Sequence, residues 1–139
     1  MKRSFLCLLF FTLLACTEAE QDENEVRLLS GQWQLSTLTG SRVGSGSDFT
    51  PGELDWNINL FASVVSVSSN LDEGDPKRGQ FPLEIGVHTF DLIQQEEELR
   101  YTYDFIVEGE RLGTLSWRQG QLRLDTGLAS DGFLYIFRR

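Results

Sequence analysis

Cysteine and histidine are scarce in this chain of 139 residues, which argues against disulfides and against transition-metal sites. The two cysteines, Cys7 and Cys16, lie close to the N-terminus, so the remainder of the chain has no disulfide with which to stabilise itself. Histidine occurs once, as His88. A zinc or other transition-metal site needs several ligands at defined spacings, and the sequence shows no such set. We therefore expect no metal and no cofactor.

Long apolar runs are also lacking. The longest one, residues 4–15, is shorter than the roughly 20 residues that a transmembrane helix needs. No later segment of helical length has apolar residues at a period of 3.6, the spacing typical of an amphipathic helix. These two absences argue against a transmembrane helix in the apolar start and against amphipathic helices in the rest of the chain.

The apolar run ends in the sequence Leu13-Leu14-Ala15-Cys16. Lys2 and Arg3 precede the apolar run, and an acidic stretch, residues 17–25, follows the cysteine. The arrangement resembles a bacterial lipoprotein signal peptide with its lipobox. The resemblance implies cleavage before Cys16, a lipid such as palmitate on its sulfur, and a place in the cell envelope, at the outer membrane. A plain secretory signal and a buried helix are the alternatives.

Three segments follow from this interpretation: a signal peptide at 1–15, a lipidated cysteine with an acidic tether at 16–25, and a folded domain at 26–139. The tether has the composition of a disordered spacer. Its acids also resemble the export signal of surface-exposed lipoproteins in Bacteroidetes-type bacteria. Both interpretations are compatible.

Positive charge is in deficit. The formal net charge is −9, and loss of Lys2 and Arg3 with the signal peptide would take it to −11. Nucleic acids and anionic lipid headgroups repel such a surface, so we expect no nucleic-acid partner.

Beyond residue 26, apolar residues alternate with polar ones, which is the pattern of half-buried β-strands. Leu54, Trp56, Ile58 and Leu60 provide one example. We predict eight strands, at about 27–38, 53–60, 62–69, 86–93, 98–108, 111–118, 121–126 and 131–138. The join at Leu60-Phe61-Ala62 contains no turn residue, so the second and third of these could also be one bent strand or meet at a bulge.

Short joins that carry Gly109, Gly120 and Gly132 predict an antiparallel up-and-down meander. Such a meander closes into a barrel or folds over into a β-sandwich, and we favour the eight-stranded barrel. Two joins are long, 39–52 and 70–85, and they follow the first and third strands. In an up-and-down barrel both lie at the same end, where we expect any binding mouth to be.

Gly31-Gln32-Trp33 on the first strand, the alternation Tyr101, Tyr103, Phe105, and the terminal Arg138-Arg139 together resemble a lipocalin-like domain of small bacterial lipoproteins. In that family the first-strand tryptophan plugs the closed end of the barrel, and an arginine of the last strand covers it. A guanidinium over an indole contributes about 0.5–2 kcal/mol. Both faces of the last strand are apolar, so the pattern leaves open which arginine covers Trp33.

The inward-facing positions carry many aromatic residues. These side chains either line an apolar pocket or fill the barrel, because eight strands enclose little space. The candidate ligand-binding wall comprises Trp56, Phe90, Tyr101, Tyr103, Phe105 and Trp117.

Other polar groups give weaker signals. His88 shares a face with Phe90 and Leu92 and is interpreted as a satisfied wall residue. Residues 71–76 contain three acids but lack the ligand spacing of a calcium loop. An enzyme would need His88 or Asp104 as general base, and Asp104 falls on the predicted outer face, so the sequence favours a non-enzymatic protein.

Two functions remain. The first is a binding module that holds a small apolar or amphipathic ligand at the long-loop end. The second is a protein-interaction module, for example an inhibitor of an envelope enzyme, with the barrel as a solid scaffold. A basic partner would suit the acidic surface.

Overall fold

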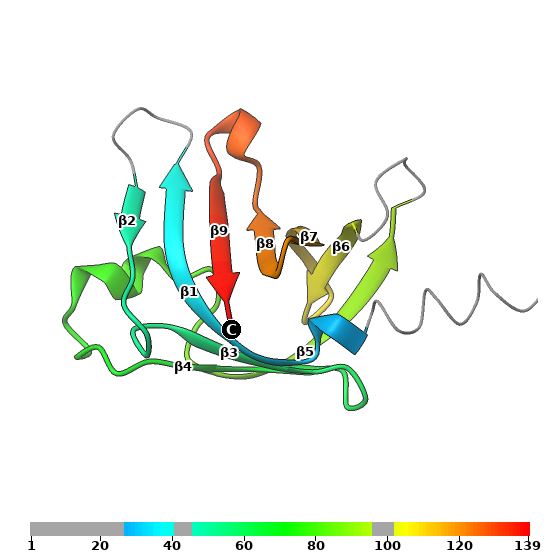
Figure 1. Cartoon of the computed structure of the whole chain (residues 1–139), viewed down its shortest axis with the longest axis horizontal. Coiled ribbons are helices and arrows are strands. Elements are labelled where there is room, and N and C mark those ends of the chain that lie inside the picture. The colour runs from blue at the N-terminus through cyan, green and yellow to red at the C-terminus, as the bar shows by residue number, and fades with distance from the viewer. Residues whose placement is uncertain (1–26, 41–45, 96–101) are drawn as a thin grey trace, which may run out of the picture.

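The computed structural model describes residues 27–40, 46–95 and 102–139. Strands in this part of the chain form one antiparallel sheet in the order β2-β1-β3-β4-β5-β6-β7-β8-β9, and a further pairing of β1 with β9 closes it. Eight strands therefore make an up-and-down barrel, with β2 added beside β1 (Figure 1). The predicted barrel is confirmed, and the pairing of β1 with β9 rules out the sandwich.

The strand bounds agree with the alternation in the sequence. They are β1 (Gly31–Gly40), β2 (Gly46–Asp48), β3 (Asp55–Asn59), β4 (Val64–Ser68), β5 (Gly86–Gln94), β6 (Thr102–Val107), β7 (Glu110–Arg118), β8 (Gln121–Asp125) and β9 (Phe133–Arg138). Two short 3₁₀ helices, η1 (Pro76–Gln80) and η2 (Leu128–Ser130), lie in the joins β4–β5 and β8–β9.

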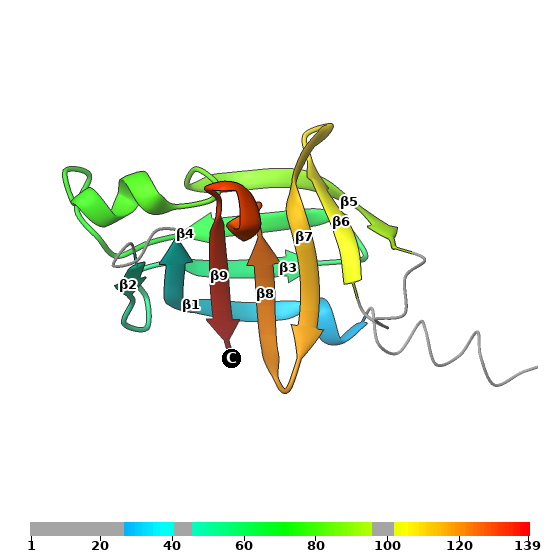
Figure 2. The ribbon, with the colours of Figure 1, turned by 90° about the horizontal axis from the view of Figure 1, so that it is seen from above.

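The barrel is built as two crossed layers. Figure 2 shows β3, β4 and β5 running across the back while β7, β8 and β9 cross in front. β1 belongs to both layers, because its first half pairs with β3 and its second half with β9. The register with β9 shifts between Leu35 and Thr37, and such a bulge lets a strand bend between layers.

Two tight hairpins form as predicted. Glu108-Gly109 joins β6 to β7 and Gln119-Gly120 joins β7 to β8, and all four residues have positive φ, between 51° and 86°. Two-residue turns of this kind match the right-handed twist of the strands they join, and glycine adopts positive φ without steric cost.

The join without a turn residue is nevertheless a turn. Residues 60–63 separate β3 from β4, and Ser63 has a φ of 52°. The Asn59 side chain accepts a hydrogen bond from the Ala62 amide at 3.0 Å, which supplies the local bond that a turn residue would provide. The alternatives of one bent strand or a bulge are therefore wrong.

Two local predictions are corrected. Arg27, Leu28 and Leu29 are helical rather than extended, and the first strand starts at Gly31. Trp33 Nε1 donates to the Leu29 carbonyl at 2.7 Å, so the final carbonyls of this turn are satisfied by tertiary contacts. The long 39–52 join also contains the unpredicted strand β2, which pairs with Thr37, Leu38 and Thr39 of β1.

The core fills the barrel. Fully buried side chains from β1, β3, β6 and β9 meet in its centre, where the rings of Trp56 and Phe137 lie 4.5 Å apart and those of Trp56 and Phe105 lie 5.9 Å apart. Such aromatic contacts add to the stability gained by burial.

Candidate functional site at the long-loop end of the barrel

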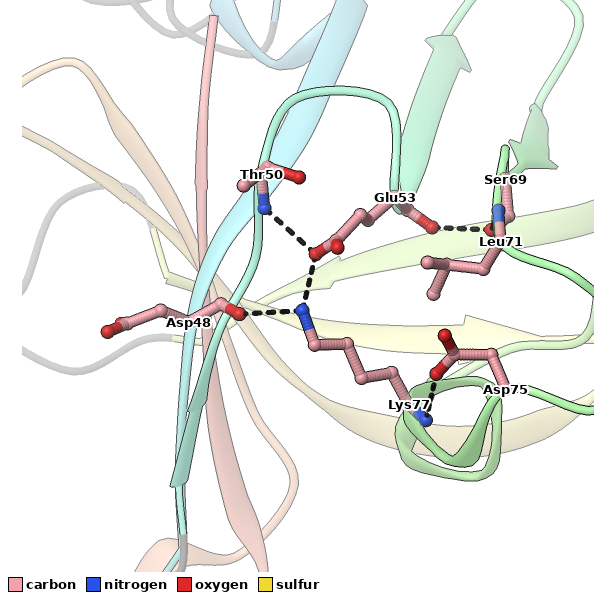
Figure 3. Close-up of polar contacts among 7 residues, drawn as sticks. All are labelled: Asp48, Thr50, Glu53, Ser69, Leu71, Asp75 and Lys77. Carbon is pink, nitrogen blue, oxygen red and sulfur yellow. Dashed lines mark hydrogen bonds and ion pairs between the residues drawn. The ribbon is translucent and has the colours of Figure 1, made fainter.

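The two long loops meet at one end of the barrel, as predicted, and a lysine joins them. Figure 3 shows Lys77 of η1 reaching across to the 39–52 join and the residues that follow it. Its Nζ lies 2.7 Å from Glu53 Oε2 and donates to the Asp48 carbonyl at 3.2 Å. It also lies 5.1 Å from the centre of the Phe49 ring. We call this set of contacts the Lys77 clamp.

Local capping positions both partners of the clamp. Asp75 accepts a hydrogen bond from the Lys77 amide at 2.8 Å, and Pro76 follows it at the start of η1. On the other side, Glu53 accepts from the Thr50 amide at 2.9 Å. The bond from Lys77 is the main cause that lowers the pKa of Glu53, and the Thr50 amide adds to it. The clamp therefore holds a charged pair in place before any partner binds.

A cleft of about 470 Å³ lies beside the Lys77-bearing loop, between the β4–β5 join and the β6–β7 hairpin. Apolar side chains and acids share its wall. Its lining residues are Pro82, Leu83, Glu84, His88, Val107, Glu108, Glu110, Arg111 and Leu112. The mixture of Leu83, Val107 and Leu112 with carboxylates suits an amphipathic contact.

His88 connects the two sides of this cleft. Its Nδ1 lies 2.9 Å from Glu108 Oε1, and its Nε2 lies 2.9 Å from the Glu84 carbonyl oxygen. Both neighbours are acceptors, so only the doubly protonated imidazolium donates to both at once. The Glu84 carbonyl is the main cause that raises the pKa of His88, with Glu108 adding to it and burial opposing it. The prediction of a satisfied wall histidine is confirmed.

A second cleft, of about 430 Å³, adjoins the first and shares Leu83 and Glu84 with it. Its other lining residues are Glu73, Arg78, Gly79, Phe81 and Ile85. Phe81 packs on Phe49 with ring centres 6.4 Å apart, so the floor of this cleft is continuous with the clamp.

Acids dominate the described charges at this end. Lys77, Arg78 and Arg111 are its basic residues, and its acidic residues are Asp48, Glu53, Asp72, Glu73, Asp75, Glu84, Glu108, Glu110, Asp125 and Asp131. Such a concentration attracts a basic surface and speeds its approach.

The predicted ligand-binding wall lies inside the barrel but leaves little room there. Trp56 and Phe105 are 0 % exposed, Phe90 and Tyr103 are also buried, and Trp117 is partly buried against the same core. Phe90 and Phe105 lie 5.4 Å apart. Tyr101 lies outside the described residues. The rings of Trp56 and Phe90 both contact that of Phe105, so these three side chains fill the interior rather than line a pocket.

The opposite end of the barrel is closed by Trp33. The Arg139 guanidinium lies 4.6 Å from the Trp33 ring and donates to the carbonyls of Leu28 at 2.6 Å and Ser30 at 2.9 Å. This contact identifies Arg139, rather than Arg138, as the arginine that covers the tryptophan.

The candidate catalytic bases are both engaged. Asp104 accepts hydrogen bonds from Arg111 and Gln95, each at 2.8 Å, and Arg111 is the main cause that lowers its pKa. His88 Nε2, which would take a proton from a nucleophile, faces the Glu84 carbonyl. In the described part of the chain, no group of three His, Cys, Asp or Glu residues is placed to hold a metal ion.

Sequence reasoning placed both long loops at one end of the barrel, as observed, but missed the residues that hold them together. Lys77, Glu53 and Leu83 carry no motif, and only the Asp75-Pro76 pair signals that a helical turn begins there. Cys16 and the tether lie outside the described residues, so their prediction is not tested by the geometry.

Comparison of the chain with family models, with curated proteins and with solved structures found no match. In the residues that the structure describes, no helix has the length and hydropathy needed to cross a membrane.

Proposed function

We propose that this protein is a lipid-anchored, non-enzymatic binding module of the cell envelope, and that its long-loop end holds a protein partner with a basic surface. The barrel serves as a rigid scaffold, because its interior is occupied by its own side chains. The anchor is the lipid on Cys16, at the outer membrane.

The observation that carries this proposal is the construction of the long-loop end. Two adjoining clefts open there, acids surround them, and the Lys77 clamp and His88 hold the loops on either side. A preorganised surface loses little conformational entropy when a partner binds, so more of the contact energy remains as affinity.

The engaged state of His88 and Asp104 supports the absence of catalysis. His88 lies between two acceptors, and Arg111 lowers the pKa of Asp104, which makes its carboxylate a weaker base.

A second candidate function is favoured by the first cleft alone. Its volume of about 470 Å³ falls within the range of small-molecule sites, and Leu83, Val107 and Leu112 would contact an apolar portion of a ligand. An amphipathic small molecule would then bind at the mouth of the barrel rather than inside it.

Native mass spectrometry of the protein extracted from its own membranes separates the two candidates. Co-purification of a small molecule of fixed mass supports the second, and a complex with a second protein supports the first. The partner complex is then measured with Glu73→Lys and Glu110→Lys, two exposed positions that line the clefts.

The matched control is Asp91→Lys, which changes another exposed acid, on the outer side of β5. We expect each cleft variant to weaken binding several-fold and to reduce its salt dependence, with the control close to wild type. Equal losses from all three variants would contradict a site at the long-loop end.

The anchor is tested separately by mass spectrometry of the mature N-terminus. An acylated Cys16 is expected, and Cys16→Ser should release the protein from the membrane fraction. A mature chain that begins elsewhere would contradict the anchor but not the binding surface.

A further inference from the structure

An apolar turn projects from the end of the barrel opposite the long loops. At its tip Phe61 is fully in solvent, with an exposed fraction of 102 %, and Ala62 beside it is exposed as well. Turn tips usually carry Gly, Asn, Asp, Ser or Pro, which suit water and tight backbone conformations. A phenyl ring in this position loses favourable burial unless something covers it.

This turn lies next to the point at which the chain enters the barrel. The Leu60 amide donates to Ser30 Oγ at 3.2 Å, and Ser30 directly precedes β1. Arg139 fixes the Leu28 carbonyl at the same place, and the Leu28 side chain is partly exposed. Phe61, Leu28 and the N-terminal connection therefore share one end of the molecule.

The connection to Cys16 is short. Ten residues, 17–26, separate Cys16 from Arg27. Fully extended, that stretch spans at most about 36 Å. A lipid on Cys16 would keep this end of the barrel close to the bilayer.

Charge is divided between the two ends. Acids surround the long-loop clefts, whereas four exposed arginines lie at the opposite end: Arg27, Arg118, Arg138 and Arg139. Figure 2 shows the C-terminus beside the turn between β7 and β8. Arg118 pairs with Gln121 of β8, and Phe137, which precedes Arg138, pairs with Leu122, so both arginines lie at the same end of β8. The net charge of the whole chain is negative, but the described charged residues of this end are basic. The connection between Gln95 and Thr102 carries Glu96, Glu97 and Glu98 and lies outside the described residues.

We propose that this end docks on the bilayer that holds the lipid anchor, with Phe61 inserted among the headgroups and Arg27, Arg118 and Arg138 against anionic lipids. Aromatic and basic residues together are what interfacial membrane contacts use. The inference rests on the proposed anchor at Cys16. It deepens that function, because docking would turn the long-loop end away from the membrane and toward its partner.

The test uses the full lipidated chain in vesicles of phosphatidylethanolamine and phosphatidylglycerol. An environment-sensitive nitrobenzoxadiazole label is attached through Ala62→Cys, beside Phe61, or through Ala129→Cys in η2 at the opposite end as a control. We expect the label at 62 to shift its emission to shorter wavelength and to be quenched by brominated lipid. The label at 129 should keep its emission in water.

Phe61→Ser in the Ala62→Cys chain should remove the shift. The matched control is Val87→Ser, which removes an exposed apolar side chain from β5 and should leave the shift intact. Both side chains lie in solvent, so both variants are expected to fold.

Flotation with the vesicles reports the anchor independently. Protein that floats but gives a water-like emission at 62 overturns the docking alone, whereas protein that fails to float contradicts the anchor and the docking with it. A shift that appears without vesicles and grows with protein concentration would assign Phe61 to a second copy of the chain, and would also overturn the proposal.

Discussion

At the scale of single residues, two contacts account for how the barrel is closed and how its mouth is held. Arg139 covers Trp33 at the closed end, and His88 connects two loops at the other. Each contact combines a charge with a fixed acceptor or aromatic face, so each can be removed by one substitution.

Arg139→Ala is expected to lower the free energy of unfolding by about 2 kcal/mol, since it removes a cation–π contact and two charge-assisted hydrogen bonds. Urea unfolding measures the change. The neighbouring Arg138→Ala serves as the control and should stay within about 0.5 kcal/mol of wild type, as is usual for exposed positions. Equal effects would contradict the assignment of Arg139.

His88 makes stability depend on pH. Its pKa is raised above the ordinary 6.5, so its contribution is complete below that pH and is lost as pH rises through the folded-state pKa. Glu84 and Glu108 contact it, Glu110 and Arg111 line the same cleft, and Val65 of β4 pairs with it. The free energy of unfolding should fall by on the order of 1 kcal/mol, because solvent around Glu108 screens its interaction with His88.

Denaturation at pH 5.5 and 8.5 tests this dependence against His88→Gln. The wild type should have a higher free energy of unfolding than the variant at pH 5.5, and this difference should disappear at pH 8.5. An advantage that grows with pH would show that the neutral imidazole is the stabilising form.

At the scale of elements, the Lys77 clamp decides whether the long loops behave as one surface. A double-mutant cycle with Lys77→Met and Glu53→Gln should give a coupling of about 0.5–1 kcal/mol, because the pair is partly shielded from solvent. The pKa of Glu53 is lowered, so the coupling is complete above its ordinary 4.5 and fades as pH falls through the folded-state value.

Hydrogen exchange of residues 70–85 gives a second measurement of the clamp. Amide exchange in this segment should be faster in Lys77→Met than in the wild type, and the double variant should show the same increase. Independent, additive effects of the two substitutions would indicate that the loops are held by something other than this pair.

A comparison of the predicted with the observed elements shows which parts of the fold the sequence pattern predicts. Strict alternation in β3, β6, β7 and β8 predicted strands whose observed bounds differ by only a few residues. The helical 27–29 segment was taken as strand because Leu28 and Leu29 continue the apolar stretch, and tertiary bonds from Trp33 and Arg139 decide otherwise. β2 was missed since its Gly-Ser-Asp sequence has no strand signal and depends on the free edge of β1.

The candidate site was predictable only in its location. Loop order in an up-and-down barrel placed both long joins at one end, and the contact of Lys77 with Glu53 and the Asp48 carbonyl confirms it. The described wall residues were correctly placed inside the barrel. Whether their rings line a pocket or fill the interior depends on the enclosed volume, which the alternation of apolar and polar residues does not reveal. The first cleft depends on how the β4–β5 join lies relative to the β6–β7 hairpin, which are far apart in the sequence.

At the scale of the whole molecule, the filled interior predicts how the barrel responds to a cavity. Phe105→Ala should lower the free energy of unfolding by about 3–5 kcal/mol, the usual loss when a large core side chain is truncated. Phe61→Ala, which truncates a fully exposed phenylalanine, should cost less than about 0.5 kcal/mol. A barrel that tolerates Phe105→Ala would be a hollow carrier instead.

The measurement that tests the central claim most directly is photo-crosslinking in intact cells, with a benzophenone amino acid at Glu110 beside the first cleft or at Asp91 on the outer side of β5. The account predicts a covalent adduct of one defined protein mass from position 110 and none from position 91. An adduct formed at 91 but not at 110 would contradict a binding surface at the long-loop end.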